Sequence, residues 1–243
     1  MQSSFSPVFA DAGLFCRILV RGWTQGNVAH VSDLFRFMIA REGIPFILPP
    51  LVLAVILGLL GYWPLAVFLL LFSGFMVFFF RDPRRSIPTE SGIIVSSADG
   101  TVTRIDETES GKLVSVFLSP LDVHINRSPI AGQITKIEYV RGKKLPATKN
   151  EASFVNERNS LTIQNNQMSV VCTQIAGILA RRIVCRVNEG DNLAIGERFG
   201  LIKFSSRTDV LMPRNVEVTV GVGDKVKGGI TIIGRLPNFT KSA

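Results

Sequence analysis

Residues 44–80 read IPFILPPLVLAVILGLLGYWPLAVFLLLFSGFMVFFF, and these 37 residues contain no Asp, Glu, Lys or Arg. A single membrane-spanning helix needs about 20 apolar residues, so the stretch is too long for one helix and just long enough for two. Its middle, GYWP at 61–64, combines a glycine and a proline, which break helices, with two aromatic residues that favour a membrane interface. The stretch therefore predicts two apolar helices, at residues 50–60 and 65–80, joined by a turn.

The predicted lengths leave two forms of membrane insertion open. At 1.5 Å per residue the second helix spans about 24 Å and the first is shorter, whereas the hydrocarbon core is about 30 Å thick. A shallow re-entrant hairpin therefore fits as well as a full double crossing. A buried hairpin inside a soluble protein is the alternative without a membrane, but two helices that are apolar all round need a large partner to cover them.

Basic residues flank the apolar stretch on both sides. Arg36 and Arg41 precede it, and Arg81, Arg84 and Arg85 follow it. Positively charged flanks stay in the cytoplasm, so we expect both ends and the C-terminal domain on the cytoplasmic side of the inner cell membrane. The three following arginines are candidate ligands for lipid phosphate, with a role in membrane orientation as the equal alternative. A cleavable signal peptide fits poorly, because the apolar region begins more than 40 residues into the chain.

The rest of the chain divides at this hairpin. Residues 1–43 are a mixed segment predicted to be partly helical, whereas residues 81–243 alternate short apolar and polar runs cut by Gly, Asn and Pro, as strands do. Asn165-Asn166 predicts a hairpin turn, and residues 176–182 show a short helical pattern. Strands are predicted at 112–118, 132–140, 161–164, 168–174, 216–220 and 229–234. The predicted fold is mostly β, a compact antiparallel β domain with an N-terminal apolar helical membrane hairpin.

Charge and cysteine content exclude several classes of protein. Of the net charge of +8, residues 81–243 carry +7, which does not fit one evenly mixed soluble globule. Cys16, Cys172 and Cys185 lie far apart and form no CxxC pair, and the chain has only two histidines. We therefore expect reduced cysteines, no disulfide scaffold and no metal site.

Three stretches stand out as candidates for chemistry: SSADG at 96–100, LSPLDVHINR at 118–127 and RFGLIKFSSRTDV at 198–210. The first contains Asp99, the second contains His124, and the third contains the pair Ser205-Ser206. Taken singly, an Asp-Gly or Ser-Ser pair is more often a turn, and a lone histidine beside an aspartate is more often a loop residue than a catalyst.

Taken together, these stretches resemble the short, bacterial type of the phosphatidylserine decarboxylase family. The matching blocks are FFRDP at 79–83 with Arg85, Ile87 and Pro88, ADG at 98–100, residues 118–129, NERN at 156–159, QIAGILARRI at 174–183, and residues 198–213. They occur in the family's order across residues 79–213, and the apolar hairpin before them fits too. Each motif alone is a weak sign of the family, but six motifs in the family's order are highly specific for it.

The resemblance implies a proenzyme that cleaves itself between Ser205 and Ser206. The Ser206 hydroxyl attacks the preceding carbonyl, and elimination then turns Ser206 into a pyruvoyl group, leaving a β chain of residues 1–205 and an α chain of residues 206–243. Only Ser, Thr or Cys carries a heteroatom on Cβ that serves first as nucleophile and then as leaving group. Through a Schiff base, the pyruvoyl group would accept electrons as phosphatidylserine loses CO₂ and becomes phosphatidylethanolamine.

The same resemblance implies the partners. A two-tailed lipid does not leave the bilayer readily, because each exposed CH₂ costs about 0.8 kcal/mol. We therefore expect the active site of a phosphatidylserine enzyme to reach the membrane interface, in contact with membrane lipids. The α and β chains of one precursor would remain partners, a homodimer is left open, and no nucleic acid is expected.

Two positions depart from the family's pattern. The family usually has glycine before the cleaved serine, where this chain has Ser205, and its longer members have a second histidine where this chain has Arg127. In those members an Asp–His–Ser relay acts; Asp99 matches its acid and Ser206 its serine, but its histidine has no counterpart. We therefore predict that His124 assists proton transfer.

The sequence also allows two alternative interpretations. The chain would be a non-catalytic, membrane-anchored β module of the same fold if Ser205 prevents cleavage. Alternatively, VGVGDKVKGGITIIGR at 220–235 has the glycine-rich hairpin texture of a biotinyl or lipoyl carrier domain, which would present Lys225 or Lys227 for modification.

Overall fold

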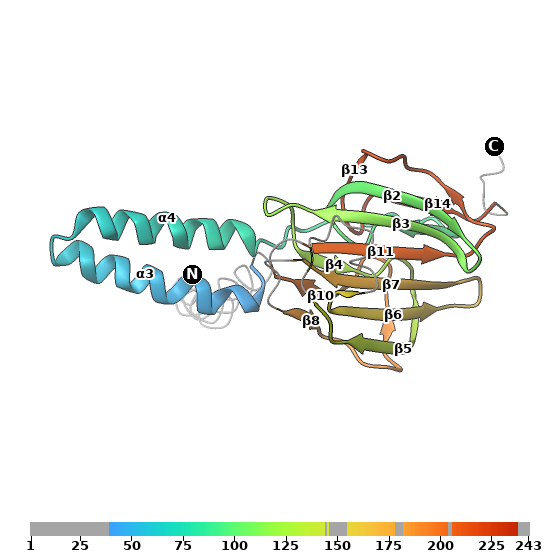
Figure 1. Ribbon diagram of the computed structural model, residues 1–243, viewed down its shortest axis with the longest axis horizontal. Coiled ribbons are helices and arrows are strands. Elements are labelled where there is room, and N and C mark those ends of the chain that lie inside the picture. Colours follow the sequence, from blue (N-terminus) through green and yellow to red (C-terminus); the bar gives the residue numbers. More distant parts are fainter. Residues whose placement is uncertain (1–38, 144, 146–154, 178–181, 204–205, 238–243) are drawn as a thin grey trace, which may run out of the picture.

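The computed structural model describes residues 39–143, 145, 155–177, 182–203 and 206–237. Within these residues the protein is mostly β, and a helical hairpin projects from one end of a curled antiparallel sheet (Figure 1). The predicted fold class is thereby confirmed. Nearly all of the mixed segment at 1–43, and Ser205 of the predicted cleavage site, lie outside the described residues.

The apolar stretch folds into two helices that lie side by side, α3 (Ile44–Leu59) and α4 (Trp63–Phe79), after the short 3₁₀ helix η1 (Arg41–Gly43). The turn between them uses Gly61 at φ +85°, a left-handed conformation that glycine adopts without strain. Most large apolar side chains of both helices are exposed. By length and composition, Arg41–Leu59 could cross a membrane, and α4 is a shorter apolar helix.

The first helix begins earlier than predicted, at Ile44 instead of residue 50. Proline removes a backbone hydrogen bond, which is why the prediction started the helix after the prolines. In the structure Pro49 and Pro50 lie inside α3. Near them, the Ser73 hydroxyl of α4 donates to the Ile47 carbonyl (2.9 Å), which bonds the neighbouring helix to α3.

The hairpin is fixed to the β domain at its base. The Ala40 amide donates to the Phe80 carbonyl (2.8 Å), which joins the chain before α3 to the chain after α4. Gly43 permits this closure, since a Cβ there would lie 2.6 Å from Cγ of Phe80. Around this point Met76, Phe79, Phe80, Val123, Ile125 and Leu201 form one buried apolar cluster, so α4 packs directly on the β domain.

Among the described residues, the strands form one eight-stranded sheet and two three-stranded sheets. The large sheet has the order β13-β2-β3-β11-β7-β6-β5-β9, and the small sheets have the orders β4-β10-β8 and β1-β14-β12. The bounds are β1 (Ile93–Val95), β2 (Gly100–Thr108), β3 (Gly111–Leu118), β4 (Ile125–Arg127), β5 (Gly132–Val140), β6 (Arg158–Gln164), β7 (Ser169–Ala176), β8 (Ile183–Cys185), β9 (Asn192–Leu193), β10 (Arg198–Ile202), β11 (Ser206–Met212), β12 (Glu217–Val218), β13 (Lys225–Val226) and β14 (Ile232–Arg235). The strand β11 is therefore central, with β3 on one side and β7 on the other.

Most predicted strands are present, with shifts at their ends. The predicted turn at Asn165 joins β6 to β7, and the Asn165 amide donates to the Met168 carbonyl (3.0 Å). The helix predicted at 176–182 is wrong at its start, because Ala176 ends β7, and residues 178–181 lie outside the described part. The Ala176 amide donates to the Glu157 carbonyl (3.0 Å), so strand pairing outweighs the helical preference of alanine.

The carrier-domain interpretation is wrong. Lys225 lies in β13, which pairs with β2, whereas β14 pairs with β1 and β12. Glycines in left-handed conformations, Gly223 (φ +99°) and Gly229 (φ +75°), turn the chain so that the two strands join different sheets. Residues 220–235 therefore form no hairpin with Lys225 or Lys227 at its tip.

The hydrophobic core lies between the large sheet and the two small ones. Its buried side chains include Val116, Leu161 and Val210 from the large sheet, Phe199 from β10 and Ile94 from β1. Each sheet thus buries one face against another, which is the layered arrangement expected of a β domain of this size.

The start of β2 requires glycine, which gives a test of the fold. Gly100 has φ +151°, and a Cβ there would lie 2.0 Å from the Phe117 carbonyl oxygen. Gly100→Ala is expected to lower the free energy of unfolding by about 2–3 kcal/mol, measured by chemical denaturation in detergent micelles. The control Gly221→Ala, whose Cβ would meet only Asp224 at 3.6 Å, should change it by less than about 1 kcal/mol. Equal effects of the two variants would contradict the close approach of β2 and β3.

Candidate active site

Ser206 begins the central strand β11, where it is paired with Leu118 of β3 and Ala176 of β7. The residue is fully buried, and its hydroxyl has no hydrogen-bond partner among the described residues. A buried polar group without a partner costs about 1–3 kcal/mol, so its presence in a folded protein calls for a functional explanation. Ser206 is thus a candidate nucleophile.

His124 precedes β4 in a loop that its own residues shape. The Asp122 carboxylate accepts from the Ser119 amide (2.8 Å) and the Asp122 amide donates to the Ser119 carbonyl (2.9 Å), which closes a turn around Pro120. The Nδ1 atom of His124 bonds to the Asp122 carbonyl (2.9 Å). Since a carbonyl only accepts, Nδ1 carries the proton, and the lone pair of the neutral ring lies on Nε2. Within the described residues the buried Nε2 has no partner.

The His124 ring is held in its neutral form. Burial, the largest influence, lowers the pKa of His124 from 6.5 to about 4, against the opposing hydrogen bond and charge of Asp122. The charge of Arg81 lowers this pKa further, and that of Asp99 raises it. The ring of Phe79 covers the imidazole, with the two ring centres 4.2 Å apart. At pH 7 Nε2 is therefore unprotonated.

His124 lies immediately before β4, and Ser206 begins β11. At the end of β10 the Ile202 amide donates to the His124 carbonyl (3.3 Å), and the chain enters β11 at Ser206 shortly afterwards. Two residues further along each strand, the Asn126 side-chain amide donates to the Thr208 hydroxyl (3.1 Å). The strands β4 and β11 belong to different sheets, and this bond links them two residues beyond His124 and two residues beyond Ser206.

Asp99 is held by Arg85 and not by His124. The two terminal nitrogens of Arg85 donate to the two carboxylate oxygens at 2.6 and 2.7 Å, and the Gly228 amide donates to one of them at 2.8 Å. The Arg85 side chain is only 4% exposed. In the described part of the chain Asp99 makes no hydrogen bond to His124, and the bidentate ion pair occupies Arg85, which was predicted as a phosphate ligand.

Arg81 and Arg84, the other two candidate phosphate ligands, differ in their surroundings. Arg81 donates to the carbonyls of Phe78 (2.8 Å) and Leu121 (2.6 Å), and thereby ties the end of α4 to the loop of His124. Arg84 is exposed on the linker that follows the hairpin. Arg81 is half-buried, and both arginines lie at the foot of the hairpin.

Arg127, which stands where longer family members have a second histidine, is buried in a cluster of charges. Its guanidinium donates to the Asp82 carboxylate (2.9 Å) and to the Gly196 carbonyl (3.1 Å). The other Asp82 oxygen lies 2.5 Å from Nε of Arg198. Arg127 therefore ties the linker to β4 and β10 and supplies no proton acceptor.

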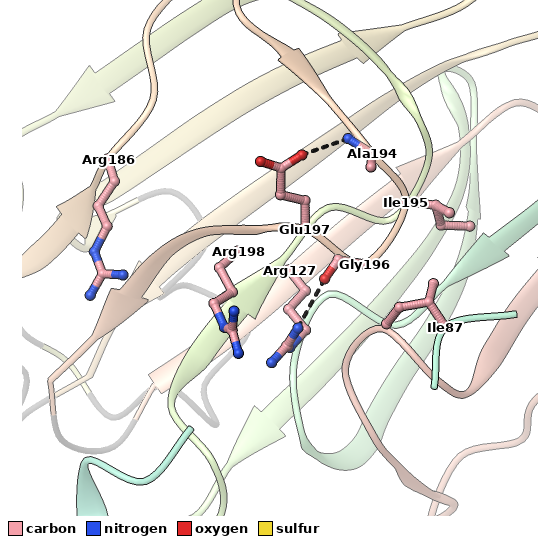
Figure 2. Close-up of a pocket in the computed structure, with 8 residues that line it drawn as sticks. All are labelled: Ile87, Arg127, Arg186, Ala194, Ile195, Gly196, Glu197 and Arg198. Carbon is pink, nitrogen blue, oxygen red and sulfur yellow. Dashed lines mark hydrogen bonds between the residues drawn. The ribbon is translucent and has the colours of Figure 1, made fainter. Parts of the chain in front are cut away.

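A pocket with a volume of about 520 Å³ lies beside this cluster (Figure 2). Figure 2 shows the guanidinium groups of Arg127 and Arg198 side by side, with that of Arg186 pointing the same way. Each of these arginines pairs with a carboxylate, because Asp82 is shared by Arg127 and Arg198 and Glu42 pairs with Arg186. None of the predicted catalytic residues lines the pocket, so we assign no part of the chemistry to it.

The residues at the site fit a group made from the chain itself. Ser206 has the buried Cβ hydroxyl that a pyruvoyl precursor needs, and the residue before β4 is a neutral histidine. In the described ranges no three His, Cys, Asp or Glu side chains are placed to hold a metal ion. The Cys172 thiol is inert as a nucleophile, because burial raises its pKa to about 12.

Sequence reasoning missed two residues of the site. Phe79 covers the His124 ring, and Asn126 joins β4 to β11. Both lie in stretches that had been singled out, and Asn126 follows His124 at the period-two spacing of one strand face. The alternation of a strand shows which residues share a face, but it does not show which other strand packs against that face. The residues that contact Phe79 and Asn126 therefore could not be named from the sequence.

Comparison with known proteins identifies the family. Residues 72–234 match the family model described as phosphatidylserine decarboxylase. Proteins named phosphatidylserine decarboxylase proenzyme are similar to this chain: that of Symbiobacterium thermophilum is 47% identical over 85% of this chain and all of its own length. That of Carboxydothermus hydrogenoformans is 46% identical over 81% of this chain and 95% of its own, and that of Geotalea uraniireducens is 42% identical over 82% and 97%.

The burial of His124 predicts its titration. In the uncleaved chain the imidazole should titrate with a midpoint of about 4, measured by NMR on a His30→Ala variant that retains a single histidine. Because this pKa lies below the unfolded value of 6.5, the unfolded chain binds more protons between the two. The contribution of His124 to stability is therefore complete above pH 6.5 and is lost as the pH falls to 4. A midpoint near 6.5 would show a ring open to water.

Proposed function

The chain belongs to the phosphatidylserine decarboxylase family and is a carboxy-lyase, and from this premise we propose that it is a self-cleaving proenzyme whose Ser206 becomes a pyruvoyl group. The mature enzyme then converts phosphatidylserine to phosphatidylethanolamine. One observation carries the proposal: within the described residues, the buried hydroxyl of Ser206 and Nε2 of the neutral His124 are both unpartnered, and Asn126 and Thr208, two residues further along each chain segment, are bonded to each other.

Self-cleavage in this proposal uses two side chains. Nε2 of His124 accepts the proton of Ser206 Oγ while Oγ attacks the carbonyl carbon of residue 205. The O–C bond forms, the peptide C–N bond breaks, and the proton passes to the Ser206 nitrogen, so that the peptide becomes an ester. Loss of the Ser206 α proton then breaks the Cβ–Oγ bond and releases residue 205 as a carboxylate. Tautomerisation and hydrolysis, which consume one water and release ammonia, leave a ketone at position 206.

A ketone conjugated to an amide supplies a sink for the electron pair that remains when a carboxylate departs as CO₂. The chain's own residues would hold this position and move protons around it. Leu118 and Ala176 fix residue 206 from both sides, and Nε2 of His124 takes up or returns a proton. Phe79 keeps water from the His124 ring.

Asp99 has a positioning role in this proposal. Its carboxylate holds Arg85 of the linker and the amide of Gly228, two segments far apart in sequence, at the start of β2. It therefore acts through Arg85 instead of completing an Asp–His–Ser relay. Its charge still reaches His124 through space.

We place the reaction at the cytoplasmic face of the inner cell membrane. The exposed apolar side chains of α3 and α4 favour a lipid environment, and the basic residues on both sides favour a cytoplasmic location for both ends. His124 contacts Phe79 in the last turn of α4, so the site lies at the foot of the hairpin. There the half-buried Arg81 and the exposed Arg84 supply positive charge, which would attract the phosphate of the substrate.

The second candidate function is an uncleaved, membrane-anchored module without activity. The residue that favours it is Ser205, because glycine at this position relieves crowding at the scissile bond and serine does not. The fold is the same in both proposals, so only the covalent state of the chain separates them.

Intact mass spectrometry of the chain purified from its own membrane tests the proposal. The wild type should give two chains, residues 1–205 and residues 206–243, the second reactive toward hydrazines. Ser206→Ala should give one chain near 26.7 kDa and release no CO₂ from phosphatidylserine vesicles. An uncleaved, inactive wild type that is cleaved once Ser205→Gly is introduced would support the second candidate.

Replacement of His124 should slow self-cleavage without changing the binding of the protein to membranes. His124→Gln is expected to slow self-cleavage by about 100-fold or more, because general-base assistance contributes on that scale. Flotation with vesicles should be unchanged, since the apolar hairpin is intact. His30→Gln serves as the matched control and should cleave like the wild type. Loss of flotation together with cleavage would make His124 a structural residue.

A further inference from the structure

A chain of buried side-chain hydrogen bonds ends two residues from Ser206. The Asn159 amide donates to the Gln174 side-chain oxygen (3.0 Å), the Gln174 amide donates to the Asn126 side-chain oxygen (2.8 Å), and the Asn126 amide donates to the Thr208 hydroxyl (3.1 Å). All four residues are at most 2% exposed. The mechanism proposed above uses none of them.

The four residues span three strands of the large sheet and one strand of a small sheet. Thr208 of β11 pairs with Gln174 of β7, and Gln174 pairs with Asn159 of β6, so these three form one row across the large sheet. Asn126 of β4 comes from the other sheet and bonds to both Thr208 and Gln174. It is thus a polar connection between the two layers, in the row next to Ser206.

Such a connection fixes register in a way that apolar packing does not. The surrounding contacts between the layers are apolar and tolerate small shifts, whereas amide bonds are directional and costly to leave unpaired when buried. A slide of β4 along β11 would break the Asn126–Thr208 bond. The same slide would move His124 relative to Ser206, because each stands two residues before a member of that bonded pair.

We propose that Asn126, Gln174, Asn159 and Thr208 are positioning residues that set His124 against Ser206 for self-cleavage. The inference rests on the proposed function and adds residues to it. Misplacement of reacting groups by about 1 Å costs up to about 100-fold in rate, so loss of one link should slow cleavage without preventing folding.

Thr208→Val is the sharpest test, because it removes the hydroxyl and keeps the shape. Freshly synthesised full-length chain, made in the presence of phospholipid vesicles, is chased over time and the fragment 206–243 is quantified. Cleavage in Thr208→Val should be at least about 10-fold slower than in the wild type. Thr208→Ser restores the hydroxyl and should restore most of the rate.

The matched control is Thr173→Val. Thr173 lies in the neighbouring strand β7, and its hydroxyl bonds to that of Ser160 (2.9 Å), outside the chain of four residues. It should lower thermal stability about as much as Thr208→Val while leaving the cleavage rate near that of the wild type. A second readout is the pH at which the cleavage rate has fallen to half of its maximum as the pH is lowered. If the His124 ring is less tightly held, water reaches it and its pKa rises. The half-maximal pH should therefore rise from about 4 toward 6.5 in Thr208→Val but not in Thr173→Val.

The outcomes distinguish this inference from the proposed function. If the wild type cleaves and Thr208→Val cleaves equally fast, or if both valine variants slow cleavage in proportion to lost stability, the positioning role is overturned and the function stands. If the wild type itself never cleaves, the proposed function fails first.

Discussion

The site depends on the burial of the His124 ring between the end of α4 and the β domain. Phe79 covers the ring, and the bond from Nδ1 to the Asp122 carbonyl directs the lone pair to Nε2. Burial is also the main cause of the low pKa of His124, so the packing that excludes water from the ring also keeps it unprotonated at pH 7. Since Phe79 belongs to the apolar hairpin, the state of the base is coupled to how that hairpin packs.

Charged residues of the linker after the hairpin reinforce this packing. Asp82 forms ion pairs with Arg127 of β4 and Arg198 of β10, and Arg85 forms an ion pair with Asp99 at the start of β2. Buried ion pairs gain little net stability, because desolvation offsets their attraction, but breaking one leaves an unpaired buried charge. Their effect is therefore to fix where the linker runs, and with it the angle at which the hairpin leaves the domain.

Features that depend on a local sequence pattern could be predicted from the sequence. Contacts between residues far apart in the sequence could not. The uncharged run predicted two helices, alternation predicted most strands, and motif order pointed to Ser206 and His124. Arg85 was assigned to lipid because its distance of fourteen positions from Asp99 carries no sign of a bond. Asn126 was overlooked for the same reason: its partners Thr208 and Gln174 are 82 and 48 positions away.

The place of β11 explains how a chain of this fold would tolerate cleavage at its own centre. Residues 206–212 pair with β3 along their whole length, and all but the last also pair with β7, so the segment after the proposed cut is held from both sides. Further on, β13 pairs with β2, and β14 lies between β1 and β12. Strands of the segment after the cut are thus interleaved with strands that precede it in all but the β4-β10-β8 sheet. Breaking one peptide bond before β11 would remove a connection and no strand pairing, and the new end would stay where Leu118 and Ala176 hold it. A strand at a sheet edge would be held from one side only, so the central place of β11 suits the proposed cleavage before Ser206.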